Sequence, residues 1–116
     1  MNNINHSNHL QNTRIIVVPV FGTRISSRLD CADNLMLFTI SGFTIKDREK
    51  IRLVSYNELD KIQVITSVKP DIIICDGITD LYKNQLEERK IKVIPWIRGE
   101  VEEVLIQYLK GKLNHE

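Results

Sequence analysis

The stretch IKVIPWIRGEVEEVLIQYLKGKL, residues 91–113, pairs a short apolar run with an amphipathic helix that has signals at both ends. Five apolar residues recur at helical spacing and form one stripe that must pack against another element: Val101, Val104, Leu105, Tyr108 and Leu109. Glutamates fill the first turn, where the helix dipole favours carboxylates, and Gly111 can adopt the left-handed conformation that ends a helix. The stretch therefore predicts a strand over 92–97 and a helix that closes a domain.

The composition bounds the size and class of the protein. Its 116 residues are 42% hydrophobic and 27% charged, which suits one globular domain and leaves no room for a second. A formal net charge of +1 gives no bulk field that would attract nucleic acid or an anionic membrane. No apolar run approaches the roughly 20 residues that span a bilayer, and the N-terminus lacks the apolar stretch of a secretory signal. We therefore expect a cytoplasmic protein with no nucleic-acid or membrane partner.

The N-terminal residues differ in character from the rest of the chain. Residues 1–13 are polar and rich in asparagine, with too few large apolar side chains to offset the entropy of ordering them. We predict a flexible tail there and a single folded domain over 14–116. His6 and His9 have a spacing that can bind a metal ion, but in such a tail we expect them to be solvated.

Apolar runs indicate the strands. Residues 15–20, 72–74 and 93–97 are apolar runs, typical of parallel strands buried on both faces. They lie within strands expected over 14–21, 71–76 and 92–97, and the first of these strands should be central. Residues 35–40 and 43–54, joined by Ser41-Gly42, indicate an antiparallel hairpin. The charges at positions 46–50 of its second strand are typical of a solvent-facing edge.

Capping residues indicate the helices. Asn57 is a candidate N-cap for a helix that Pro70 ends, and Thr79 is a candidate N-cap for the next helix. The polar segment 23–34 has room for one helical turn beginning at Ser26 or Ser27. The element order predicts a three-layer α/β domain with a mixed five-stranded sheet and about three helices.

Two loops are the candidate site, because ligands of such sheets bind beyond the carboxyl ends of the parallel strands. They are residues 22–33 and 76–80. Cys31 and Cys75 lie in or beside them, and in a reducing compartment free thiols or metal ligands are favoured over a disulfide. A neighbouring carboxylate accompanies each thiol, Asp30 and Asp76 respectively; turn and capping roles compete with acid–base chemistry, for which no nucleophile or phosphate loop is evident.

Arginines and thiols near these loops admit two interpretations. Arg24, Arg28 and Arg98 can neutralise an anionic ligand by charge-assisted hydrogen bonds, or they can be ordinary surface residues. Two thiols alone cannot complete the four-ligand set of a usual iron–sulfur centre. A permanently held cluster is therefore disfavoured.

Several short motifs between residues 14 and 113 occur together in one known family. They are the strand end Val18-Pro19-Val20, the loop Ser26-Ser27-Arg28-Leu29-Asp30-Cys31-Ala32, Gly42 with Arg48-Glu49 in the hairpin, the turn Cys75-Asp76-Gly77-Ile78, and the closing elements Val101-Glu102-Glu103-Val104-Leu105 and Gly111-Lys112-Leu113. On these motifs the chain resembles the dinitrogenase iron-molybdenum cofactor biosynthesis domain, the NifX-like domain also found at the C-terminus of NifB-type proteins. In both loop motifs, family glycines are replaced by residues with polar side chains or thiols.

The resemblance implies a ribonuclease H-like fold and a non-enzymatic accessory role. The expected cargo is an iron–sulfur or molybdenum-containing cluster or its precursor, bound transiently and exchanged with donor and acceptor proteins. If the two strands are neighbours, as the resemblance implies, we expect Cys31 and Cys75 to face one cavity as metal ligands, with Asp30 and Asp76 setting its polarity and Gly77 allowing close approach of the backbone. The alternative is an interaction or regulatory module of the same fold that has lost the cluster site. A homodimer is compatible with either function.

Overall fold

The computed structural model describes residues 13–53 and 57–113. Its elements are β1 (Thr13–Phe21), β2 (Arg24–Ile25), β3 (Asn34–Ser41), β4 (Thr44–Arg52), α2 (Glu58–Ser67), β5 (Ile72–Ile74), α3 (Asp80–Glu88), β6 (Lys92–Ile94) and α4 (Val101–Leu109). The predicted α/β class is confirmed. Thr13 already belongs to β1, while His6, His9 and the rest of the predicted tail lie outside the described residues. No helix in the described part of the chain is long and apolar enough to cross a bilayer.

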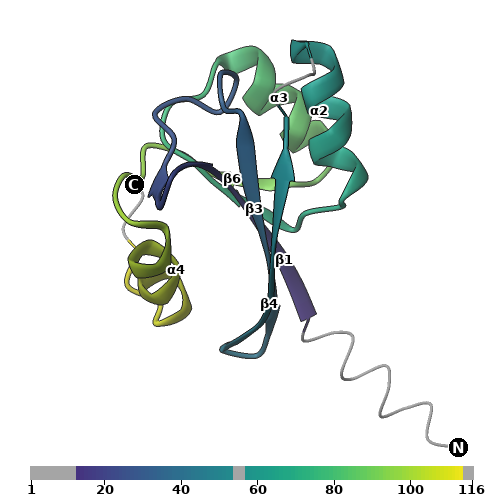
Figure 1. Ribbon diagram of the computed structural model, residues 1–116. Coiled ribbons are helices and arrows are strands. Elements are labelled where there is room, and N and C mark those ends of the chain that lie inside the picture. The colour runs from purple at the N-terminus through teal and green to yellow at the C-terminus, as the bar shows by residue number, and fades with distance from the viewer. Residues whose placement is uncertain (1–12, 54–56, 114–116) are drawn as a thin grey trace, which may run out of the picture.

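The sheet has β1 at its centre, as the apolar run over 14–21 predicts. The strand order is β4-β3-β1-β5-β6 (Figure 1). β1 pairs in parallel with β5, which pairs in parallel with β6, and β1 pairs antiparallel with β3. In the described residues the sheet has six strands rather than the predicted five, because the two-residue β2 also pairs with β1.

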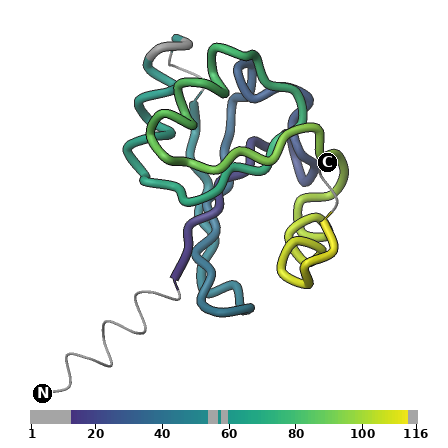
Figure 2. The backbone as a smooth tube through the Cα atoms, turned by 180° about the vertical axis from the view of Figure 1, so that it is seen from behind, coloured from purple at the N-terminus to yellow at the C-terminus, as the bar shows by residue number. Residues whose placement is uncertain are grey.

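Helices cover both faces of the sheet and make three layers. α2 and α3 lie on one side and α4 lies on the other (Figure 1), a separation that is also visible from behind (Figure 2). Alternate residues of β1 supply the two cores: Ile16 and Val18 pack on the α4 side, whereas Val17 packs on the side of α2 and α3. This alternation explains why the central strand is apolar throughout.

The closing helix has the predicted face and ending. Val101, Val104 and Leu105 are buried in the core on its side of the sheet, and Tyr108 and Leu109 pack against the same core. Gly111 follows with φ of 72°, the left-handed conformation that favours glycine. Burying each large aliphatic side chain contributes roughly 1.5–3 kcal/mol, so this stripe holds the layer in place.

Two of the predicted N-caps, Asn57 and Thr79, are confirmed. The Asn57 side chain accepts a hydrogen bond from the backbone N–H of Asp60 at 2.8 Å, and the Thr79 hydroxyl accepts one from Tyr82 N–H at 3.2 Å. α2 ends before Pro70, and Lys69 has φ of 54°. The capping side chains therefore set where α2 and α3 begin.

The hairpin forms as predicted, with its turn one residue later. Ser41 pairs with Thr44, so the two turn residues are Gly42 and Phe43, and Gly42 supplies the left-handed conformation at φ of 62°. The pairing register of β3 and β4 shifts close to the hairpin turn, where Lys46 of β4 is the extra residue of a bulge. β4 is the solvent-facing edge strand that its charges predict, and the bulge further disfavours pairing with another chain.

The expected helical turn at Ser26 or Ser27 is wrong. Residues 23–33, all of which the structure describes, form β2 and an irregular loop instead, and β3 begins at Asn34. Their backbone N–H groups bond to distant segments: Ile25 donates to Gly99 O at 2.9 Å and Leu29 donates to Gly77 O at 2.9 Å. The Leu29 N–H, to which a capping Ser26 or Ser27 side chain would bond, is thus taken by another loop, so tertiary contacts override the local preference.

An ion pair ties the edge strand to the closing helix, and we expect it to be acid-sensitive. The Arg48 guanidinium donates two hydrogen bonds to the Glu102 carboxylate, at 2.8 and 2.9 Å. These bonds hold the pKa of Glu102 below its ordinary value of 4.5 and raise the pKa of Arg48. The stabilisation is therefore present above about pH 4.5 and is lost as the pH falls through the lowered pKa of Glu102.

Glu102→Gln should lower the free energy of unfolding at neutral pH by at most about 1 kcal/mol, because the pair is solvent-exposed and screened. The difference from wild type should vanish in acid, as measured by urea unfolding across the pH range. Glu103→Gln, one position along α4, is the matched control. An acid dependence of Glu102→Gln identical to that of wild type would contradict the assignment.

Candidate functional site

Three loops meet beyond the carboxyl ends of β1, β5 and β6, where the fold favours ligand binding. Backbone hydrogen bonds join them directly: Ile25 N–H donates to Gly99 O at 2.9 Å, Leu29 N–H to Gly77 O at 2.9 Å, and Trp96 N–H to Asp76 O at 3.0 Å. The loops are residues 22–33, 76–80 and 95–100. Because each loop bonds to a neighbouring loop, the side chains that they present have fixed relative positions.

Gly77 allows the loops 22–33 and 76–80 to pack closely against each other. Its N–H donates to Ser27 O at 2.9 Å, and a β-carbon on Gly77 would lie 2.8 Å from that same oxygen. Real β-carbons essentially never come within 3.0 Å of such an atom. Gly77 is not among the glycines with a left-handed φ, so its role is close packing of two loops rather than a turn.

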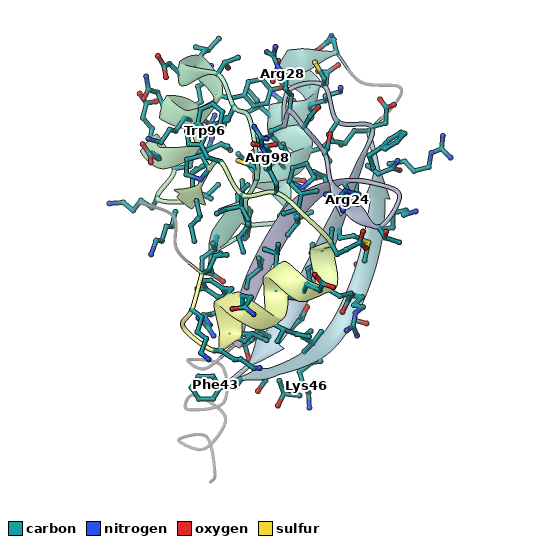
Figure 3. All side chains as sticks on the ribbon, turned by 90° about the vertical axis from the view of Figure 1, so that its left-hand side faces the viewer. Arg24, Arg28, Phe43, Lys46, Trp96 and Arg98 are labelled. Carbon is teal, nitrogen blue, oxygen red and sulfur yellow. The ribbon has the colours of Figure 1, made fainter. Side chains whose placement is uncertain are left out.

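A cleft of about 590 Å³ opens between the three loops. Its walls are Arg24, Ile25, Ser27, Arg28, Asp76, Gly77, Ile78, Thr79, Trp96, Arg98 and Gly99. Trp96, Arg98, Arg28 and Arg24 lie at one end of the molecule, opposite the hairpin tip with Phe43 and Lys46 (Figure 3). Arginine is thus contributed to this cleft by two separate loops, 22–33 and 95–100.

Buried carboxylates hold two of these arginines. Arg28 donates to both carboxylate oxygens of Asp30, at 3.2 and 2.7 Å, and the Nε of Arg98 lies 3.3 Å from Asp76 Oδ2. The Arg98 side chain is 81% exposed, whereas that of Asp76 is 11% exposed. The carboxylates therefore lie beneath the surface and the guanidinium groups face solvent.

The third arginine is paired at the rim of the cleft. The Nη1 of Arg24 lies 3.2 Å from Glu100 Oε2, and both side chains are exposed. A guanidinium has five N–H donors, and its carboxylate partner uses one or two of them. Donors therefore remain on Arg24 and Arg98 for an anion in the cleft.

The predicted thiols lie in different environments. Cys31 is exposed beside a neighbouring hollow of about 440 Å³ that Phe21, Arg24 and Ser27 also line. Cys75 is fully buried in the core on the side of α2 and α3. Burial raises the pKa of the Cys75 thiol to about 12, with a further contribution from the charge of Asp76.

The structure therefore brings together part of the predicted site. Asp76 and Gly77 line the cleft, and Asp30 lies beneath it as the partner of Arg28, but Cys31 and Cys75 do not line one cavity. No group of three or more His, Cys, Asp or Glu side chains suited to a metal ion occurs in the described residues. Ligand roles for the two thiols, and binding roles for Asp30, Asp76 and Gly77, stay predictions.

Sequence reasoning missed Trp96, the only tryptophan of the chain. It follows the third parallel strand, so the rule that selected the first two loops also applies to residues 95–100. An aromatic residue close to Arg98, just after a buried strand, was the available signal. The strand predicted over 92–97 is too long, because β6 ends at Ile94 and residues 95–97 belong to the loop.

The two thiols should differ sharply in reactivity. Because the thiolate is the nucleophile, iodoacetamide at about pH 8 should modify Cys31 in the native protein and leave Cys75 intact. Mass spectrometry should find one modified cysteine per native chain and two after unfolding in urea. Rapid modification of Cys75 in the native protein would contradict its burial.

Comparisons with known proteins agree on the fold. No protein-family model and no curated protein sequence matches the chain. The solved structure of PH0822 is similar, with a TM-score of 0.82 and 17% identity over 88% of this chain and 94% of that chain. A protein from Methanocaldococcus jannaschii, provisionally named a dinitrogenase, gives a TM-score of 0.75 and 16% identity over 90% of this chain and 95% of the other.

A Thermotoga protein, provisionally named NifB and placed in the DUF35 family, gives a TM-score of 0.67 and 15% identity over 88% of this chain and 92% of the other. The chain therefore has the α/β fold of these solved structures, two of which are provisionally named as a dinitrogenase and as NifB, and the resemblance predicted from the sequence is confirmed at the level of the fold. At these identities the likeness shows the fold alone, and the site must be judged on its own residues.

Proposed function

We propose that this protein binds an anionic metal–sulfur cluster, or its iron–sulfur or molybdenum-containing precursor, in the arginine-lined cleft and delivers it during cofactor assembly. The observation that supports this most is the pair Arg28 and Arg98, anchored on separate loops by the buried carboxylates of Asp30 and Asp76. The protein acts as a carrier rather than as an enzyme.

The charge and shape of the cleft suit such a cargo. Thiometalates and many metal–sulfur clusters are anions, and charge-assisted hydrogen bonds from arginine are stronger than neutral ones. The volume of about 590 Å³ lies within the usual range of ligand pockets. Trp96 and Arg98 on its walls are exposed to solvent, so a bound cargo remains accessible to an acceptor.

Cys31 is the better placed of the two predicted ligands. Its hollow shares Arg24, Ile25 and Ser27 with the cleft, so the thiol lies just beyond one wall. Ligation by Cys75 requires the loss of a proton from a buried group with a raised pKa, and requires a change in its packing. We therefore assign the main holding force to the arginines and a supplementary ligand role to Cys31.

The partners in this proposal are proteins that donate and accept the cluster. The fold neighbours that are provisionally named as a dinitrogenase and as NifB support this setting. The competing proposal, an interaction module that has lost the cluster site, is favoured by the separation of the two thiols. A homodimer is compatible with both proposals.

Anaerobic reconstitution separates the two proposals. The purified protein is mixed with iron and sulfide, or with tetrathiomolybdate, and visible absorption is recorded after desalting for wild type, Cys31→Ala and Cys75→Ala. We expect a chromophore on wild type that is weaker on Cys31→Ala and retained on Cys75→Ala. If wild type keeps no chromophore, the interaction module is favoured. If both variants keep the chromophore as wild type does, neither thiol is a ligand of the cluster.

A further inference from the structure

Trp96 adopts a backbone conformation that a large aromatic residue rarely takes. Its φ is 67°, in the left-handed region. Two backbone hydrogen bonds, one from Trp96 and one from the next residue, hold Trp96 in this conformation. Trp96 N–H donates to Asp76 O at 3.0 Å, and Ile97 N–H donates to Cys75 O at 2.9 Å. Such strained positions concentrate at ligand sites, where the surrounding structure fixes them.

The side chain that this backbone presents is unusually open. Trp96 is 68% exposed although tryptophan is usually well buried. It lines the cleft and also a second hollow of about 390 Å³ over α4, so Trp96 borders both. Ile78 also lines the cleft, which gives the site an apolar surface beside its guanidinium groups.

We propose that Trp96 makes the cleft selective for sulfide-covered anions over oxygen-covered anions of equal charge. This inference rests on the proposed function and adds a substrate class and a specificity-determining residue to it. The arginines supply attraction to any dianion, whereas Trp96 and Ile78 favour only an anion whose surface tolerates an apolar contact.

Tetrathiomolybdate and molybdate show the distinction, because both are tetrahedral dianions. Sulfur is large and polarisable and makes favourable contacts at the edge of aromatic rings, where the ring carries partial positive charge. An oxoanion binds water strongly, and placing its oxygens against an indole face removes hydrogen bonds without replacing them. The same cleft should therefore bind the thioanion more tightly, although its guanidinium groups serve both anions.

Equilibrium dialysis with each anion separately, under anaerobic conditions and with molybdenum measured in both chambers, tests this. For wild type we expect a dissociation constant at least about tenfold lower for tetrathiomolybdate than for molybdate. In Trp96→Gly the ratio should fall to about twofold or less, through weaker thioanion binding. Glycine suits the left-handed backbone, so this variant removes the indole without adding strain.

Two further variants complete the test. Trp96→Phe retains an aromatic face and should recover most of the preference. Phe43→Ala removes another open aromatic residue, 81% exposed, at the hairpin tip away from the cleft, and should leave the ratio unchanged. Circular dichroism of each variant confirms that the fold is retained.

The outcomes distinguish this inference from the proposed function. If wild type binds tetrathiomolybdate and Trp96→Gly keeps the wild-type ratio, the role of Trp96 is overturned while the carrier proposal stands. If wild type binds both anions equally well, the selectivity itself is overturned. If wild type binds neither anion, this inference is overturned, and the carrier proposal falls as well only if reconstitution with iron and sulfide also leaves no chromophore on wild type.

Discussion

Replacing Arg28 and Arg98 together with alanine should weaken binding of tetrathiomolybdate by at least about 100-fold, because each charged hydrogen bond contributes roughly 1.5–3 kcal/mol. The two guanidinium groups come from different loops and face solvent, and each is oriented by a buried carboxylate. Their removal also leaves the charges of Asp30 and Asp76 unpaired, which repels an anion. Equilibrium dialysis under anaerobic conditions measures the change.

Lysine substitutions separate charge from geometry. Arg28→Lys with Arg98→Lys retains both charges but loses the planar fork of donors, so binding should fall about tenfold rather than 100-fold. Arg89→Ala is the matched control, because Arg89 follows the far end of α3 and donates to Gln85 O on the surface. Equal binding by the double alanine variant and the Arg89→Ala control would contradict the assignment of the cleft.

The second large effect is expected for Gly77→Ala. The new β-carbon would lie 2.8 Å from Ser27 O, a backbone atom held by the hydrogen bond from Gly77 N–H. Relief of this contact requires the two loops to separate, which should lower the free energy of unfolding by about 1–3 kcal/mol. Because Arg28 and Asp76 lie next to the contact, tetrathiomolybdate binding should also weaken. Urea unfolding and equilibrium dialysis measure the two effects.

Gly111→Ala is a suitable comparison for Gly77→Ala. Gly111 has φ of 72°, and a β-carbon added there would meet no described atom within 4 Å. It follows α4 and lies outside the residues that line the cleft. Its substitution should cost roughly 1–2 kcal/mol through left-handed strain and leave anion binding unchanged. If Gly77→Ala binds the anion as wild type does, the packing of these two loops does not shape the cleft.

The fold was largely predictable because its determinants are local. The continuous apolar run of β1 indicates burial on both faces, and the stripe of α4 indicates a helix with one buried side. Asn57 and Thr79 cap their helices by contacts within three residues. The loop over 23–33 was not predictable in this way, because its backbone bonds to the loops around residues 77 and 99, which are far away in the sequence.

The site was predictable only in part, because it depends on how separate strands align. Because ligands bind beyond the carboxyl ends of parallel strands, the sequence predicts the loops that contain Arg28 and Gly77 as part of the site. It does not predict the loop that contains Trp96, because the expected strand 92–97 extends beyond the observed end of β6 at Ile94. Cys75 is turned away from the α4 side because residues alternate along β5 and just beyond it: Ile74 packs on one face and Cys75 on the other. The residues around Cys75 do not indicate on which side of the sheet its side chain is buried, because that depends on how β5 aligns with its neighbouring strands.

The most direct test of the carrier proposal is to locate the bound anion on the protein. A titration of ¹⁵N-labelled protein with tetrathiomolybdate, followed by proton–nitrogen correlation spectra, reports each backbone amide and the indole N–H of Trp96. The account predicts shifts concentrated at residues 24–28, 76–79 and 96–99, with Gly42 and Gly111 unaffected. An unchanged spectrum, or shifts centred on the hairpin or the end of α4, would contradict it.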